Sequence, residues 1–436
     1  MVKEDQMRAR VYLWGDHVGT VYEHESGSIF FAYTEEYEKN GRSISPIYLG
    51  FDRDYPVSFD NLRGRHGEES AFMGLPGVLA DALPDAFGRK AVRQYFEKQG
   101  EPDKALSPIQ QLLYVGERGI GALEFHPPKR PHMSDMEREI LNVKELALDA
   151  KKIVNNDSDV AIPEIYEMGS SAGGRRPKAI VNYSKSEDNI RSGRTVPRED
   201  EKPAILKFDG ADPDHSTTEL SASRHYNQVE HAYNKMARDV GITMPEILAL
   251  ERDGYYHLLI PRFDVREDGH RLHQHTLGGL LHIDYNNPGA GSYEEYFQSI
   301  LDLGMDYSEL REGYRRMIFN ILAINQDDHV KNLSFHMDQN GDWSLAPAYD
   351  LTFAYGSGAT RKHQMTLRGK QENIKIEDCL DVADEYGVRN PKGLIDEVQS
   401  VLEEWPDYAR GTRVPKENIK RIQELIHQRA QVFVRQ

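Results

Sequence analysis

Two acids and one carboxamide constrain this chain more than any other feature. Asp327 and Asn332 stand five positions apart in the polar segment 325–332, and Asp350 follows in the sequence Pro-Ala-Tyr-Asp. Carboxylate and amide oxygens are ligands that suit Mg²⁺, which usually also binds phosphate oxygens. A fold that brings these three side chains together would therefore hold a divalent cation beside a phosphate.

The segments around these residues predict such a fold. Residues 317–324 are apolar with helical period and contain no Gly or Pro. Residues 333–335 suit a strand, residues 338–342 suit a hairpin turn, and a second strand from Trp343 leads to Asp350. This order, with an Asp and an Asn at this offset, resembles the catalytic loop of protein kinases, H-R-D-x-x-x-x-N.

Taken one at a time, the same residues have simpler structural explanations. His329 alone would be a loop-packing or hydrogen-bonding residue, and Asp350 alone would cap a turn. The grouping favours phosphoryl transfer, in which one carboxylate accepts the hydroxyl proton while an amide and a second carboxylate hold Mg²⁺.

The composition limits the class of protein. The 436 residues suggest two or three domains, and we expect no membrane segment and no secretory signal, because no apolar run is long enough for either. The only cysteine, Cys379, excludes an intrachain disulfide and a cysteine-based zinc site, and fits a reducing cytoplasm. The net charge of −17 argues against strong nucleic-acid binding by the bare chain and is compatible with a basic protein partner.

Three units are expected along the chain. Residues 1–140 form a small α/β unit, residues 141–264 contain the parts of a kinase N-lobe in order, and residues 265–436 are mainly helical. The expected fold is therefore α+β: a protein-kinase-like two-lobed fold with a small N-terminal α/β subdomain and a mainly helical C-lobe.

Local patterns predict the main elements of the first two units. Residues 10–22 alternate around Gly-Asp and predict a β-hairpin, and a helix is expected over residues 135–148. Residues 203–209 form a short apolar strand, and residues 221–240 have helical period before Gly241 ends the helix.

One lysine interrupts the apolar strand 203–209. Lys207 could hold ATP phosphates, or it could be an edge-strand lysine whose ammonium group reaches solvent. A buried lysine needs a partner, and Glu230 on the predicted helix is the expected one. Glu219 is the competing choice, and a solvated charge is the alternative explanation of Glu230.

Two further segments are candidates for nucleotide contact. The Gly/Ser-rich segment 169–174 could wrap phosphates through backbone N–H groups, although in isolation a flexible turn is the better explanation. Residues 262–264 would form a hinge in which Phe263 packs on adenine and Asp264 bonds a ribose hydroxyl. A core aromatic residue and a turn aspartate are the alternatives.

These pieces in this order resemble the HipA family, the serine/threonine-kinase toxins of bacterial type II toxin–antitoxin modules. The resemblance runs along most of the chain, and the segments that carry it are 171–178 (SAGGRRPK), 205–208 (ILKF), 262–264 (RFD), 271–274 (RLHQ), 327–332 (DDHVKN) and 347–351 (PAYDL). It implies a protein kinase that uses ATP and Mg²⁺.

The resemblance also implies roles for single residues. Asp327 would be the catalytic base, and Asn332 and Asp350 would bind Mg²⁺. Ser171, or Ser170 beside it, would be autophosphorylated, which ejects the Gly loop and switches the kinase off. The residues implied in ATP binding are Lys207, Phe263, Asp264, Gln274, His329, Lys331, Gly173 and Gly174.

The resemblance implies partners as well. A small helix-turn-helix antitoxin dimer (HipB-like) would bind the chain and supply most contacts to operator DNA, which suits an acidic toxin. The substrate would be a protein, of which aminoacyl-tRNA synthetases are the known type, so that phosphorylation halts translation.

Two departures from the family pattern concern nucleotide affinity. Pro261 precedes the hinge where an acidic residue is frequent, and it removes one N–H donor there. Residues 175–177 (Arg-Arg-Pro) give the Gly loop a more basic and stiffer end.

Two other functions stay open at this point. One is a metal-dependent hydrolase that would gather Asp327, Asp328, His329 and Asp350 around an ion. The other is a pseudokinase that acts as an antitoxin-bound corepressor without catalysis.

Overall fold

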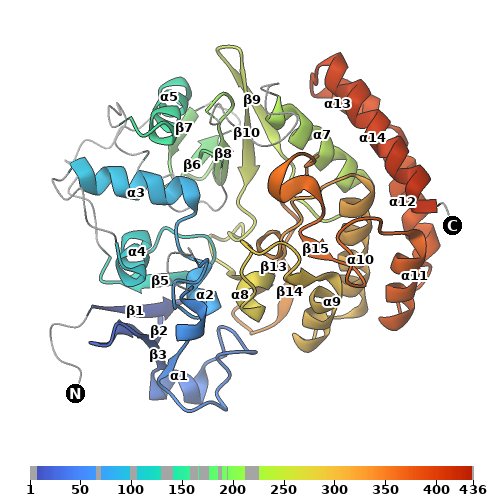
Figure 1. The fold of residues 1–436 in the computed structure, drawn as a ribbon. Coiled ribbons are helices and arrows are strands. Elements are labelled where there is room, and N and C mark those ends of the chain that lie inside the picture. The colour runs from blue at the N-terminus through green and yellow to red at the C-terminus, as the bar shows by residue number, and fades with distance from the viewer. Residues whose placement is uncertain are drawn as a thin grey trace.

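The computed structural model describes residues 7–64, 70–98, 106–128, 141–157, 165, 176–184, 189–193, 195–211 and 225–434. Figure 1 shows three parts in chain order: a sheet with short helices, a second sheet flanked by helices, and a mostly helical C-terminal part. The expected α+β, kinase-like architecture is confirmed.

Among the described residues, no helix has both the length and the apolar character needed to cross a bilayer.

The N-terminal unit is built on an antiparallel sheet with the strand order β4-β3-β2-β1-β5. Its strands are β1 (Arg8–Leu13), β2 (Asp16–Glu23), β3 (Ile29–Tyr33), β4 (Val57–Ser58) and β5 (Leu123–His126), and its helices are α1 (Glu35–Asn40), α2 (Gly77–Ala80) and α4 (Pro108–Val115). The hairpin predicted over residues 10–22 is confirmed. Its turn places Trp14 at φ +53° and Gly15 at φ +91°, the left-handed pair that a two-residue hairpin turn requires.

Two helices join this unit to the next one. Helix α3 (Ala86–Lys98) packs against α5 (Val143–Val154), and both contribute to a core that includes strands of the second sheet. The helix expected over residues 135–148 is wrong in its bounds, since residues 141–142 are not helical and α5 runs from Val143 to Val154; residues 129–140 lie outside the described part. The start of α5 is set by Asn142, whose side chain accepts bonds from the N–H groups of Lys144 and Glu145.

The second sheet is also antiparallel, with the strand order β7-β6-β8-β10-β9. Its strands are β6 (Lys178–Ser184), β7 (Asn189–Ser192), β8 (Glu201–Lys207), β9 (Leu248–Arg252) and β10 (Tyr255–Pro261), and helix α7 (Tyr226–Asp239) contacts β10. Strand β8 is central, so Lys207 at its end lies between Lys178 of β6 and Leu258 of β10. Gly241, at φ +89°, follows α7 as predicted.

The C-terminal part surrounds α10, a largely buried helix. Its helices are α8 (Leu277–Leu281), α9 (Tyr293–Asp302), α10 (Tyr307–Leu322), α11 (Ile376–Glu385), α12 (Pro391–Glu403), α13 (Trp405–Gly411) and α14 (Lys416–Val434). Its strands are β11 (His273–Thr276), β13 (Ser334–Met337) and β14 (Trp343–Leu345) in one sheet, and β12 (Gly291–Ser292) and β15 (Met365–Thr366) in another. Helices α11 to α14 form the outer layer at the right of Figure 1, and Trp405 of α13 packs on Tyr233 of α7.

Candidate active site

The polar segment that follows α10 is pinned to the chain beyond Asp350. Ile324, at φ +57°, turns the chain out of the helix. Asn325 then pairs with Ala354 in an isolated bridge, and the N–H of Gln326 donates to the carbonyl of Ala354 over 2.9 Å. The candidate catalytic loop and the segment after Asp350 are therefore neighbours, although the sequence separates them.

Asn332 closes the candidate loop. Its Nδ2 donates to the backbone oxygen of Asp327 over 2.9 Å, from the end of a short 3₁₀ turn (η3, Val330–Asn332). Because the amide nitrogen makes this bond, the amide oxygen of Asn332 remains available as a ligand. Asp327 and Asn332 thus share one small loop.

Tyr349 connects this loop to Asp350. Its hydroxyl donates to the carbonyl of Lys331 over 2.7 Å, and its ring stacks on that of Phe263 at 5.7 Å. Asp350, next in sequence, has φ +52°, which is rare for a residue with a side chain. Backbone in this region is frequent at functional sites, where the surrounding structure holds it in place.

Lys207 joins the two halves of the site. Its Nζ lies 2.5 Å from Oε1 of Glu230 on α7 and also forms an ion pair with Asp350. Lys207 is 6% exposed. Burial lowers the pKa of Lys207, but the two carboxylates outweigh burial and raise it overall. Burial likewise opposes ionisation of Asp350, yet Lys207 and Lys178 hold its pKa well below the ordinary range.

Lys178 and Asp85 lie close to these charges and were not predicted as site residues. Lys178 faces Lys207 across the β6–β8 pair, and burial, followed by the charge of Lys207, lowers its pKa. Asp85 precedes α3; its Oδ1 accepts from the N–H of Gly88, and its Oδ2 has no partner among the described residues. Burial raises the pKa of Asp85 to about 6, against the effect of Lys178. The register between two strands, which brings Lys178 beside Lys207, cannot be read from either strand alone.

The two adjacent acids of the loop have different surroundings. Asp328 is 2% exposed and accepts hydrogen bonds from the Tyr293 hydroxyl (2.8 Å), His363 Nδ1 (2.9 Å) and the N–H of Gln364 (2.8 Å). Asp327 accepts a bond of 2.6 Å from the side-chain amide of Gln364. Asp328 is therefore an internal acid that fixes residues 363–365, while Asp327 remains a candidate base.

Gln364 was missed by sequence reasoning. It lies 37 positions after Asp327 and outside any recognised motif. Its only sequence signal would have been its neighbour His363, which the folded chain pairs with Asp328.

A small aromatic cluster lies beside the hinge. The Phe263 ring is 5.7 Å from the rings of both Tyr349 and His336. Gln274 on β11 bonds His336 at 3.1 Å. Burial lowers the pKa of His336 to about 4, so its ring is neutral near pH 7. Phe263 and Gln274 both contact His336; packing of Phe263 on adenine and ATP binding by Gln274 stay predictions.

Asp264 does not have the surroundings expected of a ribose ligand. It is 1% exposed, and its two carboxylate oxygens accept from Arg262 and from the N–H of Gly121. Burial raises the pKa of Asp264, but Arg262 outweighs it and the pKa falls to about 2. This carboxylate is already paired inside the protein, because the hinge folds against the N-terminal unit. The geometry favours a structural role, and a contact of Asp264 with ribose stays a prediction.

Pro261, the other hinge departure, is the last residue of β10. It pairs with Ala204, and the next N–H, that of Arg262, donates to the carbonyl of Pro203 over 2.9 Å.

His329 and Lys331 flank the loop as expected of supporting residues. The His329 ring lies 5.6 Å from that of Tyr285, and its Nδ1 is buried without a partner among the described residues. Lys331 places its Nζ 5.3 Å from the centre of the same Tyr285 ring.

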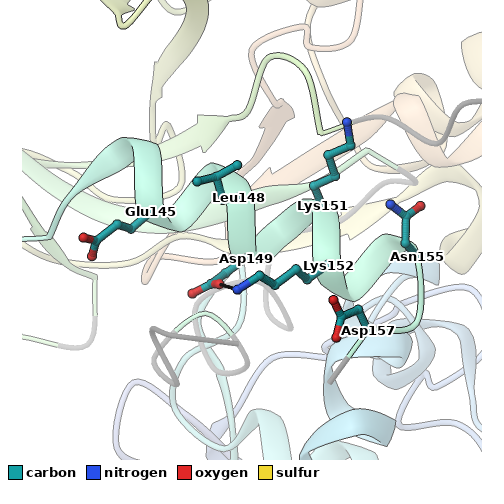
Figure 2. A pocket seen from close by; sticks show the side chains of 7 residues that line it. All are labelled: Glu145, Leu148, Asp149, Lys151, Lys152, Asn155 and Asp157. Atoms are coloured by element: carbon teal, nitrogen blue, oxygen red, sulfur yellow. Dashed lines mark hydrogen bonds and ion pairs between the residues drawn. The ribbon is translucent and has the colours of Figure 1, made fainter. Parts of the chain in front are cut away.

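Several candidates fall outside the described residues, namely Ser170, Ser171, Gly173, Gly174 and Glu219. Two cavities of the described part illustrate where open space lies relative to the candidate site. One, of about 10 Å³, lies between α7 and the Asp350 segment and includes Glu230, Ile260 and Leu351 in its lining. The other, of about 290 Å³, runs along α5, where Figure 2 shows Leu148, Lys151 and the Asp149–Lys152 ion pair on one helix. The larger cavity contains none of the predicted site residues.

The described residues hold no group of three or more His, Cys, Asp and Glu placed to bind a metal. The set Asp327, Asp328, His329 and Asp350, considered for a hydrolase, is split because Asp328 is turned to Tyr293 and His363. Two acids and an amide, the set expected of a kinase, are a different kind of donor group. The Asn332 amide oxygen and the half-exposed Asp350 carboxylate suit Mg²⁺.

Comparisons with known proteins show the family and the fold of this chain. The model of the HipA N-terminal domain matches residues 9–126, and that of the HipA-like C-terminal domain matches residues 170–405. A Shewanella oneidensis MR-1 structure, described as a toxin–antitoxin system of HipA, HipB and operator DNA, has a TM-score of 0.65. It is 16% identical and covers 98% of this chain and 96% of that chain, so the likeness concerns the fold.

Two relatives are named as kinases. A Haemophilus influenzae protein with the name "Putative kinase" is 31% identical over 135 residues, 28% of this chain and 39% of that protein. A Sinorhizobium fredii protein with the name "Putative kinase Y4mE" is 27% identical over 165 residues, 35% of this chain and 36% of that protein. The matches span less than two fifths of either relative. Because the two domain models account for most of the sequence, the chain belongs to the HipA family.

Proposed function

We propose that this chain is a Mg²⁺- and ATP-dependent protein serine/threonine kinase that acts as the toxin of a toxin–antitoxin pair. The observation that carries the proposal is the position of Lys207, which pairs with Glu230 and Asp350 together. In protein kinases, a strand lysine paired with a helix glutamate holds the phosphates, and a nearby aspartate holds the metal.

Each residue of the candidate site has a separate role in the proposed phosphoryl transfer. Asp327 accepts the proton of the substrate hydroxyl, a contribution of roughly 10²–10⁴-fold for a general base. Asn332 and Asp350 hold Mg²⁺, which supplies charge neutralisation at the phosphate oxygens when bound. Lys207 leaves Asp350 to contact the phosphates and keeps Glu230 as its partner. Gln364 orients Asp327 through the amide bond.

The nucleotide base lies near Phe263 and Gln274 in this proposal. His329 and Lys331 support the loop on the phosphate side, and Gly173 and Gly174 cover the phosphates. Asp264 acts through the hinge conformation and does not touch the ribose, because Arg262 and Gly121 already occupy its oxygens.

A hydrolase receives less support. Hydrolytic metal centres gather several carboxylates and imidazoles around an ion. Here the buried Asp328 is committed to Tyr293, His363 and Gln364. A pseudokinase also receives less support, since Lys207, Asp327, Asn332 and Asp350 are all present.

The biological setting is proposed from the family. A cytoplasmic helix-turn-helix antitoxin dimer of the HipB type binds the chain and makes most contacts to operator DNA. The substrate is a translation protein of the aminoacyl-tRNA synthetase type, and autophosphorylation of Ser171 switches the enzyme off. The proposed units are residues 1–140, 141–264 and 265–436, although α3 of the first unit packs with the second sheet.

A labelling experiment tests the proposal. The purified chain is incubated with [γ-³²P]ATP and Mg²⁺, alone and with proteins of a cell extract, beside the Asp327→Ala variant. We expect label on protein serine or threonine with the wild type and none with the variant. Release of free phosphate without protein label would instead indicate a hydrolase, and no thermal shift with Mg²⁺–ATP would indicate a pseudokinase.

A further inference from the structure

A loop of the N-terminal unit, residues 117–121, forms hydrogen bonds with the hinge (residues 262–264) between the second sheet and the helical part. The loop connects α4 to β5 and meets residues that lie about 140 to 155 positions later in the chain. In a two-lobed kinase the hinge is the place where adenine binds and where the lobes move relative to each other. The N-terminal unit, which is bonded to the hinge through this loop, can therefore influence how the hinge is positioned.

Two arginines reach the loop from the hinge side. The carbonyl of Gly119 accepts from Arg262 Nη2 at 3.1 Å and from Arg271 Nη2 at 2.5 Å. The carbonyl of Glu117 accepts from Arg271 Nη1 at 2.8 Å. Trp14 completes the contact by donating from Nε1 to the carbonyl of Arg271 over 2.7 Å. The planar guanidinium of Arg271 thus spans two carbonyls of one loop, which a lysine could not do.

Asp264 adds a contact in which the loop is the donor and the hinge is the acceptor. The N–H of Gly121 donates to its Oδ2 over 2.8 Å, and Arg262 holds both carboxylate oxygens. Its backbone oxygen accepts from the N–H of Leu272 over 2.8 Å. The side chain of Asp264 therefore ties the hinge to the 117–121 loop, and its backbone oxygen ties the hinge to the later segment at Leu272.

The side chains of Arg262 and Asp264 are buried in this contact, and Arg271 is partly buried beside them. Burial lowers the pKa of Arg271 to about 10, and the pKa of Asp264 stands at about 2. The two guanidinium groups share the Asp264 carboxylate, the charges of Glu124 and Glu117 also act on Arg271, and the carbonyls of Glu117 and Gly119 accept hydrogen bonds from the arginines. Removing one partner of such a cluster leaves a buried charge without compensation, which is costly.

The loop also lies directly against a candidate nucleotide residue. Gly121 has φ +80°. A Cβ added there would lie 3.1 Å from the backbone nitrogen of Gln274 and 3.2 Å from the Cβ of Gln274. Gln274 bonds His336, whose ring adjoins that of Phe263. A displacement at Gly121 would therefore reach the candidate ATP-binding residue Gln274 directly, and Phe263 through Gln274 and His336.

We propose that the 117–121 loop is a positioning element for the nucleotide: it holds Arg262–Asp264 and Gln274 in the conformation that receives ATP. This inference rests on the proposed kinase function. It makes the N-terminal unit a determinant of nucleotide affinity, with Gly121 and Asp264 as positioning residues that do not touch the ligand.

The test compares two glycine-to-alanine variants of the full chain. Gly121→Ala places a methyl group against Gln274, whereas Gly304→Ala introduces the same type of backbone strain, at φ +72°, with no atom within 4 Å of the new Cβ. The dissociation constant of a non-hydrolysable ATP analogue with Mg²⁺ is measured by calorimetry, and the single-turnover rate is measured at saturating ATP. For Gly121→Ala we expect affinity to fall about tenfold or more while the rate at saturation stays within about threefold. Gly304→Ala should match the wild type in both.

The outcomes separate this inference from the proposed function. A wild type that neither binds the analogue nor transfers phosphate overturns the proposed function and this inference with it. A wild type that is active, with unchanged affinity in Gly121→Ala, overturns this inference alone, even if the variant melts at a lower temperature. Should Gly121→Ala not fold, Arg271→Lys decides the question in the same assay, because it keeps the charge and loses the two-carbonyl span.

Discussion

The side-chain amide of Gln364 donates a hydrogen bond of 2.6 Å to Oδ1 of Asp327. A base that must accept a proton from a substrate hydroxyl works only when its carboxylate is correctly oriented. Gln364 is held for this task, since its own N–H donates to the buried Asp328. The amide therefore connects the internal acid to the candidate base.

Gln364→Leu should lower kcat about tenfold, which corresponds to the loss of roughly one hydrogen bond to a charged group, and leave KM for ATP unchanged. Steady-state kinetics with labelled ATP provide the measurement. Gln371→Leu is the matched control, because Gln371 donates to the carbonyl of His363 in the same segment without contacting Asp327. Equal losses in both variants would reduce Gln364 to a structural residue.

The adjacent acids Asp327 and Asp328 should respond oppositely to the same substitution. Asp327→Asn is expected to lower kcat by roughly 10²–10⁴-fold with little change in the free energy of unfolding. Asp328→Asn should lower the free energy of unfolding by about 2–4 kcal/mol, because an amide cannot accept all the bonds that Tyr293, His363 and Gln364 donate.

Activity assays and urea unfolding of the two variants, side by side, measure this contrast. An Asp327→Asn variant that retains full turnover would remove the base assignment. A stable Asp328→Asn variant would show that the internal network contributes little.

The difference between these two acids illustrates what the sequence could and could not predict. The helical period before the loop, the Asp–Asn offset and the hairpin turn are local patterns, so α10, the loop and the strand leading to Asp350 were predictable. The environments of Asp327 and Asp328 were not, because both are set by residues 363–365, far along the chain. Neighbouring positions with the same residue type carry no sequence signal that tells them apart.

The pairing of Asp264 escaped prediction for a similar reason. Its surroundings depend on Gly121, which lies 143 positions earlier and belongs to another unit. A hinge position suggests ligand contact, and only the fold reveals that the carboxylate is already paired. The packing of α3 on the second sheet escaped prediction too, since the apolar face of a helix does not identify its partner.

Glu230→Gln tests the partnership of Lys207. The variant leaves Lys207 with Asp350 as its charged partner among the residues described, so the ammonium group is drawn toward the aspartate that should hold Mg²⁺. We expect kcat/KM for ATP to fall about 10- to 100-fold and the Mg²⁺ concentration needed for half-maximal rate to rise.

Glu312→Gln is the control for losing a partly buried glutamate. Glu312 pairs with Arg316 at 3.0 Å on α10, away from the candidate site. Both variants lose an ion pair, and only Glu230→Gln should change the Mg²⁺ requirement. An unchanged Mg²⁺ requirement, measured by titration of the initial rate, would contradict the proposed geometry around Asp350.

His273 should make the stability of the chain depend on pH in the weakly acidic range. It is fully buried, its Nε2 bonds the carbonyl of Ile44 in the N-terminal unit, and burial lowers its pKa to about 3. The pKa in the unfolded chain is about 6.5. The pKa of His273 is lower in the folded chain than in the unfolded chain. The contribution of neutral His273 to the free energy of unfolding is therefore fully present above about pH 6.5 and is lost as the pH falls toward about 3. At about 1.4 kcal/mol per pH unit, roughly 2 kcal/mol is lost between pH 6.5 and pH 5.

Urea unfolding at pH 7 and pH 5 checks this expectation. His273→Gln keeps a donor for the Ile44 carbonyl and removes the titration, so its stability should fall less between the two pH values than that of the wild type. His270→Gln, at an exposed position, should behave as the wild type. His282 and His336, whose pKa values burial lowers to about 4, keep part of the pH dependence in every variant. A His273→Gln variant with the full wild-type pH dependence would mean that other groups dominate the acid loss of stability.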